Sequence, residues 1–307
     1  MSRSHVLLVW AVVATALLVT TVMHPGAPGT ASRWVQDALR TSTAQAQTPD
    51  SPAQLEWLSW MNYRLTSPKG KVILFSPWLR DAQTGGGNRE SPVTLDNIDV
   101  ATVILVPSGH GDDMGQAVEI HRKIGAPIVT THELANWMVS RGADPTKLLR
   151  GQPGSRFEVE GIKIQVVNAV HGSGASVGPG PAVYGGPSLG FIVTMENGVS
   201  VYHSMSSALT MDMQLYGRLY KPHVALLGIG SGMYPEEAAI AAEFLMTDNP
   251  NLHSVFPQHH NSTYPADRQG PAFVKAVQSR RMRREVTPFD PKPGQVFLVN
   301  ATGTKPK

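Results

Sequence analysis

The sequence of 307 residues contains no cysteine. Disulfide bonds and thiolate metal ligands are therefore excluded, although the absence is compatible with any cellular compartment. Charged residues are also scarce, at 16% of the chain, and the formal net charge is only +3. A nucleic-acid-binding domain usually concentrates far more basic charge. We therefore expect no nucleic-acid partner, and the sequence leaves the oligomeric state open.

The N-terminus contains an uncharged run at residues 6–23, followed by a segment at 27–52 that is rich in Ala, Gly, Ser, Thr and Pro. The run is at the lower limit for crossing a membrane and is long for the apolar part of a signal peptide, so both alternatives remain open. We predict that residues 1–26 are a signal peptide or membrane anchor and that 27–52 are a linker. The domain at 53–307 would then be exported or anchored outside the cytoplasm, with the membrane as a partner if the segment is uncleaved.

Three histidines each follow a stretch that is predicted to form a β-strand. His110 comes shortly after the apolar run at 103–106, His171 follows an apolar–polar alternation, and His259 follows a short run of apolar residues. Metal sites are commonly assembled from side chains at the ends of strands that are distant in sequence. The three imidazoles therefore predict a site for a divalent cation of the zinc class.

Two aspartates stand beside the first of these histidines. The segment 108–113 reads Ser-Gly-His-Gly-Asp-Asp, and a helix is predicted directly after it, at about 114–124. Asp112 and Asp113 can bind a cation or act as a general base in catalysis. Alternatively, either one can cap the helix by accepting hydrogen bonds from its first free backbone N–H groups.

The order and spacing of five segments resemble the metallo-β-lactamase fold superfamily. Within it they are most similar to the branch of metal-dependent hydrolases that includes the ascorbate-phosphate lactonase-like proteins. The resemblance extends from about Trp57 to Val299 and implies an α/β fold, an αββα sandwich of two mixed β-sheets flanked by helices. The segments that carry it are 71–79, 108–115, 169–173, 201–207 and 257–261.

Several positions differ from the family pattern that the resemblance implies. Ser108 and Asp113 stand at two histidine positions, and Ser206 stands at the position of the bridging aspartate. Trp60 replaces a histidine in the first strand, and Ser76 replaces an aspartate before a proline. Two cations about 4 Å apart need a bridging carboxylate, which a serine cannot readily replace. We therefore do not expect a standard centre with two metal ions.

A centre with a single ion remains chemically sound, because catalytic zinc usually has three protein ligands and a water. We predict one Zn²⁺ or similar divalent cation per chain, which activates water against a lactone, ester or phosphoester of a small molecule. The alternative is a catalytically silent protein of the same fold that acts as a binding module. The predicted metal ligands are His110, Asp112, His171 and His259, the predicted catalytic residues are Asp112 and Asp113, and the predicted neighbours of the ligands or substrate are Ser108, His203, Ser206, His260 and Trp60.

The sequence also predicts individual elements. Two strands are expected between residues 57 and 80, joined by a turn at 68–70. Hairpin turns are expected at Glu160-Gly161 and at Asn197-Gly198, the second as a type I′ turn. Helices are expected at about 114–124, 132–140, 210–219, 235–246 and 270–279.

Overall fold

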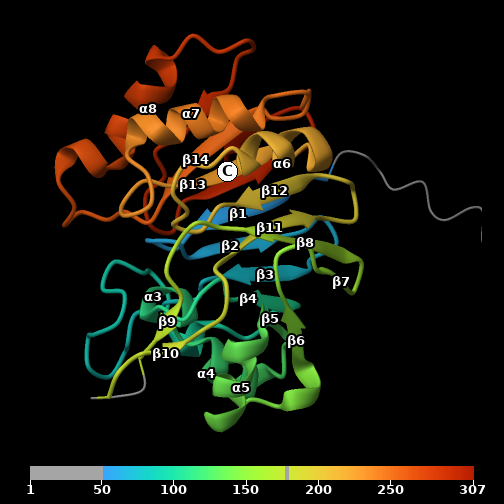
Figure 1. Ribbon diagram of the computed structural model, residues 1–307, viewed down its shortest axis with the longest axis vertical. Helices are drawn as coiled ribbons and strands as arrows, with labels where there is room; N and C mark the ends of the chain where they lie inside the picture. Colours follow the sequence, from blue (N-terminus) through green and yellow to red (C-terminus); the bar gives the residue numbers. More distant parts are fainter. Residues whose placement is uncertain (1–50, 177–179) are drawn as a thin grey trace, which may run out of the picture. The chain divides into compact units, whose positions relative to one another are not determined.

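The computed structural model describes residues 51–176 and 180–307 (Figure 1). Contacts between residues group Asp50–Lys307 into one compact unit. This part of the chain contains the helices α3 (Gly111–Met114), α4 (Ala117–Ile124), α5 (His132–Ser140), α6 (Asp212–Tyr220), α7 (Pro235–Leu245) and α8 (Gly270–Ser279).

Most of the strands belong to two mixed sheets. The first sheet has the order β17 (Thr304–Pro306), β16 (Val296–Val299), β1 (Ala53–Trp57), β2 (Tyr63–Thr66), β3 (Val72–Phe75), β4 (Val103–Leu105), β5 (Ile128–Thr131), β6 (Leu148–Gly151). The second has the order β15 (Thr287–Pro288), β14 (Ser254–Gln258), β13 (Val224–Gly228), β12 (Ser200–His203), β11 (Leu189–Thr194), β8 (Ile162–Asn168), β7 (Arg156–Val159). A small hairpin pairs β9 (Gly174–Ala175) with β10 (Val183–Tyr184).

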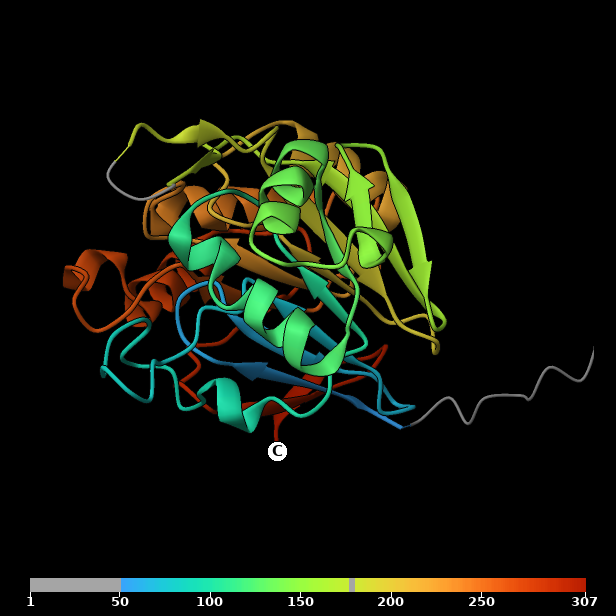
Figure 2. The ribbon, with the colours of Figure 1, turned by 90° about the horizontal axis from the view of Figure 1, so that it is seen from below.

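The two sheets pack against each other and are covered by helices on their outer faces. Phe75 of the first sheet and Phe191 of the second are fully buried members of the core between the sheets. A separate cluster packs α4 and α5 on the first sheet, and another packs α6, α7 and α8 on the second. Figures 1 and 2 show these helices on opposite sides of the strands. The predicted αββα sandwich is thus confirmed.

The strand directions bring many loops to one edge of each sheet. In the first sheet β3, β4, β5 and β6 are parallel, and in the second β12, β13 and β14 are parallel. β8 also points the same way as β12, because each is antiparallel to β11. The β1–β2 turn lies where β3 ends, since Tyr63 pairs with Phe75. The loops after β3, β4, β8, β12 and β14 are therefore candidates for a shared site.

The predicted elements agree with the structure except in detail. The two strands expected between residues 57 and 80 are β2 and β3, and the predicted turn joins them through a hydrogen bond from Gly70 N to Ser67 O. The strand β1 precedes them. Both predicted hairpins form, but the type I′ expectation at Asn197-Gly198 is wrong, because only the glycine has a positive φ. Glu160 and Gly161 both have positive φ, as that turn type requires.

The helix predicted over 114–124 is interrupted at Gly115, which has φ +44°. A Cβ on this residue would lie 2.3 Å from Pro77 O, so the backbone approaches the loop after β3 too closely for any other residue. The interruption separates α3 from α4. The other four predicted helices form within two residues of their expected bounds.

The prediction that the domain is exported or anchored outside the cytoplasm is not supported. It relied on the hydropathy of residues 6–23 alone, and these lie outside the described residues. Within residues 51–176 and 180–307, no helix has the length and apolar character needed to cross a membrane. The predicted membrane partner finds no support among these residues, and the predicted signal peptide or anchor at 1–26 lies outside them.

Candidate metal centre

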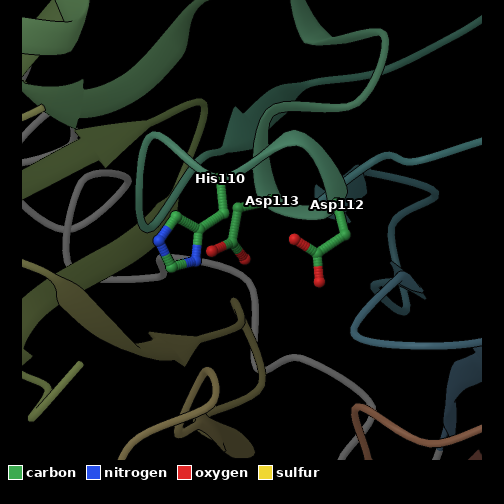
Figure 3. A group of neighbouring side chains, drawn as sticks. All are labelled: His110, Asp112 and Asp113. Atoms are coloured by element: carbon green, nitrogen blue, oxygen red, sulfur yellow. The ribbon is translucent and has the colours of Figure 1, made fainter. Parts of the chain in front are cut away.

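The loop after β4 and the short helix α3 hold the first group of candidate ligands. His110, Asp112 and Asp113 each offer a ligand atom, and these atoms all lie within 4.8 Å of one another. Figure 3 shows the three side chains projecting in the same general direction from this loop and helix. The N-cap residue of α3 is His110, so neither aspartate caps the helix as the alternative interpretation proposed. The two carboxylates are available for another role.

His171 joins this group from the end of β8. Its ring centroid lies 5.0 Å from that of His110. Gly172 permits the approach, because a Cβ there would lie only 3.3 Å from His110 Nε2. Ser188 holds the loop by donating hydrogen bonds to the carbonyls of His171 and Gly172, at 3.0 and 2.8 Å. Burial, reinforced by the positive charges of His110 and His259, lowers the pKa of His171 to about 4. The imidazole is therefore neutral near pH 7, which is the form that binds metals.

His259 reaches the group from the end of β14. Its Nε2 atom lies 3.1 Å from Asp112 Oδ2. Burial tends to raise the pKa of Asp112, but the hydrogen bond and the charge of His259 outweigh it, and the pKa is below its usual value. Two ligand atoms bound tetrahedrally to one zinc ion lie about 3.4 Å apart. The observed separation thus fits both an ion pair and two ligands of one ion.

Asp113 has a different environment from Asp112. Its side chain is fully buried, Ser76 Oγ donates to Oδ1 at 3.1 Å, and Ser108 Oγ donates to Oδ2. Burial raises the pKa of Asp113 to about 8, helped by the negative charge of Asp112 and opposed by the two serine hydrogen bonds. The carboxyl group is thus mostly protonated at neutral pH. Both oxygens are engaged, which favours an anchoring role for Asp113 over the predicted catalytic one.

Three other predicted neighbours lie at the strand ends. Ser206 is buried and accepts a hydrogen bond from Ser231 Oγ at 3.4 Å. The ring of His203 stacks on Phe75 at 4.8 Å, and its Nε2 lies 3.0 Å from Met61 O. His260 stacks on Trp57 at 4.7 Å. Among the described residues, these contacts connect the two histidines to the core and not to the candidate ligands. Their predicted contact with a ligand or substrate stays a prediction.

Trp60 does lie beside a candidate ligand, as predicted, with its ring centroid 5.1 Å from that of His259. Tyr264 was missed by the sequence analysis, although it too lies close to Trp60, at 5.6 Å between centroids. Burial and the negative charge of Asp112 raise the pKa of Tyr264, and the positive charge of Arg268 opposes them. Its only signal in the sequence is its position five residues after His259.

Left-handed backbone conformations are concentrated at this edge of the sheets. Such conformations are unfavourable for residues other than glycine and often occur at functional sites, where surrounding contacts enforce them. They are found here in the β1–β2 turn and directly after β3, β12 and β14, at Ser59, Trp60, Ser76, Met205 and His259.

Comparisons with known proteins agree with this geometry. Residues 71–272 match the family model described as the beta-lactamase superfamily domain. A UPF0173 metal-dependent hydrolase from Rubrobacter xylanophilus is 35% identical over 214 residues, which cover 69% of this chain and 83% of the relative. Another, from Methanopyrus kandleri, is 36% identical over 224 residues, covering 72% of this chain and 90% of the relative. The chain belongs to this family of metal-dependent hydrolases.

The solved structure of Igni18, a metallo hydrolase from Ignicoccus hospitalis, is similar in fold to this hydrolase. It has a TM-score of 0.66 and 24% identity, and the match covers 81% of this chain and 98% of that one. Membership of the family implies a divalent metal ion. The donor set fits such an ion, because neutral imidazoles and a carboxylate are the ligands that zinc-class cations prefer.

Proposed function

We propose that this hydrolase uses one zinc-class ion, held by His110, His171, His259 and Asp112, to hydrolyse a lactone, ester or phosphoester of a small molecule. The observation that supports it is the continuous series of contacts among these residues. His171 contacts His110, a ligand atom of Asp112 lies within 4.8 Å of one of His110, and His259 contacts Asp112.

A single ion is favoured by the side chains that surround these candidates. Ser206 provides no carboxylate to bridge two cations. Ser108 donates a hydrogen bond to Asp113, so neither side chain is free to bind a second ion. The positions that the family pattern assigns to three ligands are thus occupied by a hydrogen-bonded pair and a buried hydroxyl.

When bound, such an ion polarises a substrate carbonyl or phosphoryl oxygen and lets water act as a nucleophile near neutral pH. The protein must then accept a proton as water adds and return one to the leaving group. The three histidines would suffice as protein ligands beside a water in that step, and Asp112 is then the carboxylate suited to accept the proton, because its lowered pKa keeps it ionised and it is partly exposed, unlike Asp113.

Metal content tests the proposal directly. After incubation with excess zinc and dialysis against metal-free buffer, we expect elemental analysis to find about one ion per chain. His110→Ala, His171→Ala and His259→Ala should each lower that content strongly, because the remaining ligands cannot complete the site. His132→Ala, at an exposed position on α5, should leave it unchanged. No retained metal would contradict the proposal, and two ions would contradict the single-ion assignment.

A second experiment restores the missing carboxylate. Ser206→Asp should raise the metal content above one ion per chain, because a bridging carboxylate offsets the repulsion between two cations. Ser206→Asn introduces a side chain of nearly the same shape as aspartate but without its charge. This variant should keep one ion per chain. An unchanged content in Ser206→Asp would show that the loss of the bridging position is not what limits the site. Hydrolysis of a panel of lactones, esters and phosphoesters by the wild-type protein then tests the reaction class.

A further inference from the structure

An aromatic surface adjoins the candidate metal centre on the His259 side. The ring of Trp60 meets those of His259 and Trp78 edge to face, each at 5.1 Å between centroids. Tyr264 packs against the same indole at 5.6 Å and also lies 6.2 Å from His259. We call Trp60, Trp78 and Tyr264 the aromatic wall. It comes from three separate loops, so its assembly depends on the same strand ends as the ligands.

The aromatic wall differs from the aromatic residues that belong to the core. Trp57 and Tyr63 are only 3% and 1% exposed, and Tyr63 donates its hydroxyl hydrogen bond to Pro257 O. The three residues of the wall are each partly exposed. An aromatic ring that keeps accessible surface beside a reactive group is available to a ligand, whereas a fully buried ring is not.

The backbone fixes Trp60 relative to the candidate ligand. Its φ is +56° and that of Ser59 is +78°, so two successive residues adopt the unfavourable left-handed conformation. The carbonyl of Trp60 accepts hydrogen bonds from Trp57 Nε1 at 2.9 Å and from the backbone N–H of His259 at 3.1 Å. The second bond joins the backbone of Trp60 directly to the loop that presents His259. The edge-to-face contact of the two rings therefore starts from a fixed backbone.

The charges around the centre indicate what kind of group can approach it. The ion pair of the centre joins His259 to Asp112. Within the described residues, no lysine or arginine forms a hydrogen bond or salt bridge with any of the four candidate ligands. Arg268 lies near the wall, but it is engaged by Tyr234, with its guanidinium 4.2 Å from that ring and its Nη2 donating to the hydroxyl. Recognition of a phosphate normally uses such cations.

From these observations we infer that the substrate is an uncharged ester or lactone that carries an aromatic or other flat apolar group, and that this group packs on the aromatic wall. The inference rests on the proposed function and selects the carbonyl substrates among the three classes named there. In the reaction, the oxygen of water bonds to the carbonyl carbon as the carbon–oxygen bond to the leaving group breaks. One proton of water passes to the leaving alcohol, and the products are a carboxylic acid and that alcohol.

Binding of an uncharged aromatic alcohol tests the wall without requiring turnover. We expect the zinc-loaded protein to bind 2-naphthol in isothermal titration, with ethanol as the matched alcohol that lacks a ring. Trp60→Ala should weaken the binding of 2-naphthol about tenfold, whereas Trp60→Phe should retain most of it, because a phenyl ring preserves part of the stacking surface. Trp137→Ala, on α5 outside this edge of the sheets, should bind as the wild type does. Phenyl phosphate should bind at least tenfold more weakly than 2-naphthol.

Equal affinity in the wild type and Trp60→Ala, or tighter binding of phenyl phosphate, would overturn the inference. If Trp60→Ala does not fold, Trp78→Leu decides between the outcomes by the same loss of affinity. Hydrolysis gives a separate readout, in which the preference for phenyl acetate over methyl acetate in kcat/KM should fall about tenfold in Trp60→Ala. Binding of 2-naphthol with no hydrolysis of any lactone, ester or phosphoester would contradict the proposed function and leave the aromatic wall established.

Discussion

At the scale of single residues, the replacements in the metal centre are mutually consistent. Asp113 replaces a histidine, and its carboxyl group is held by Ser108 and Ser76, which themselves replace a histidine and an aspartate of the family pattern. Three changed positions thus form one hydrogen-bonded cluster. A buried carboxyl without such partners would be strongly destabilising, so the changes make physical sense only together.

The ionisation of Asp113 provides a test of this cluster. With a folded pKa of about 8, the carboxyl holds its proton in the native state at pH values where the unfolded chain has lost it. The contribution of Asp113 to the free energy of unfolding therefore falls as pH rises between about 4 and 8, by up to about 1.4 kcal/mol per pH unit. In metal-free protein, Asp113→Asn should remove this dependence and become progressively more stable than the wild type as pH rises. Urea unfolding at several pH values measures it.

Asp96→Asn is the matched control, because Asp96 is exposed and the substitution removes the same carboxyl group. It should unfold with the pH dependence of the wild type. Asp113→Asn should also keep the metal content of the wild type, because both carboxyl oxygens of Asp113 accept hydrogen bonds from serines. A loss of metal in this variant would identify Asp113 as a ligand instead of an anchor.

At the scale of elements, the position of α3 depends on its junction with α4. Gly115 packs against Pro77, Gln116 N donates to Pro77 O at 3.0 Å, and Gln116 Oε1 accepts from Leu79 N at 2.7 Å. These contacts fasten the helix that presents Asp112 to the loop that follows β3. The interruption of the helix is therefore a requirement for placing the ligands.

Gly115→Ala should destabilise the protein by about 2–4 kcal/mol, because the added Cβ would overlap Pro77 O and the positive φ is strained for alanine. Gly111→Ala is a control in the same helix, since a Cβ there meets nothing within 4 Å. It should change stability by less than about 1 kcal/mol, in the stabilising direction. Thermal unfolding of the two variants compares them, and equal stability would contradict the role of the junction.

At the scale of the whole molecule, buried neutral histidines make the fold sensitive to acid. Burial lowers the pKa of His203 to about 4 and, together with nearby positive charge, that of His260 to about 3 and that of His223 to about 4. Each binds a proton in the unfolded chain below about pH 6.5 but not in the native state. The contribution of these histidines to the free energy of unfolding should therefore rise with pH between about 4 and 6.5. As the pH falls through this range, that contribution is lost.

His203→Gln should make this acid dependence shallower by up to about 1.4 kcal/mol per pH unit, whatever its effect on stability at neutral pH. The comparison uses urea unfolding in the presence of a chelator, because metal binding adds its own pH dependence. His132→Gln, at an exposed histidine, should retain the slope of the wild type. An unchanged slope in His203→Gln would mean that His203 is protonated in the native state.

The sequence by itself determined the class of fold and the identity of the candidate ligands. Apolar periodicity specified most of the helices, and histidines directly after strands marked the edge where a site assembles, because parallel strands end together. These features are local and can be read within a few residues. The turn at Glu160-Gly161 was predicted in the same way, from its place between two alternating strands.

Only the tertiary structure decided the roles within the centre. Asp112 and Asp113 are adjacent and chemically identical in the sequence, yet one faces His259 and the other is buried between two serines. Burial and distant partners, which local sequence does not encode, set their pKa values apart. The same reason applies to Tyr264, which became visible only when the end of β14 brought it to Trp60. Residue types determined which chemistry is available, and packing determined which side chain performs it.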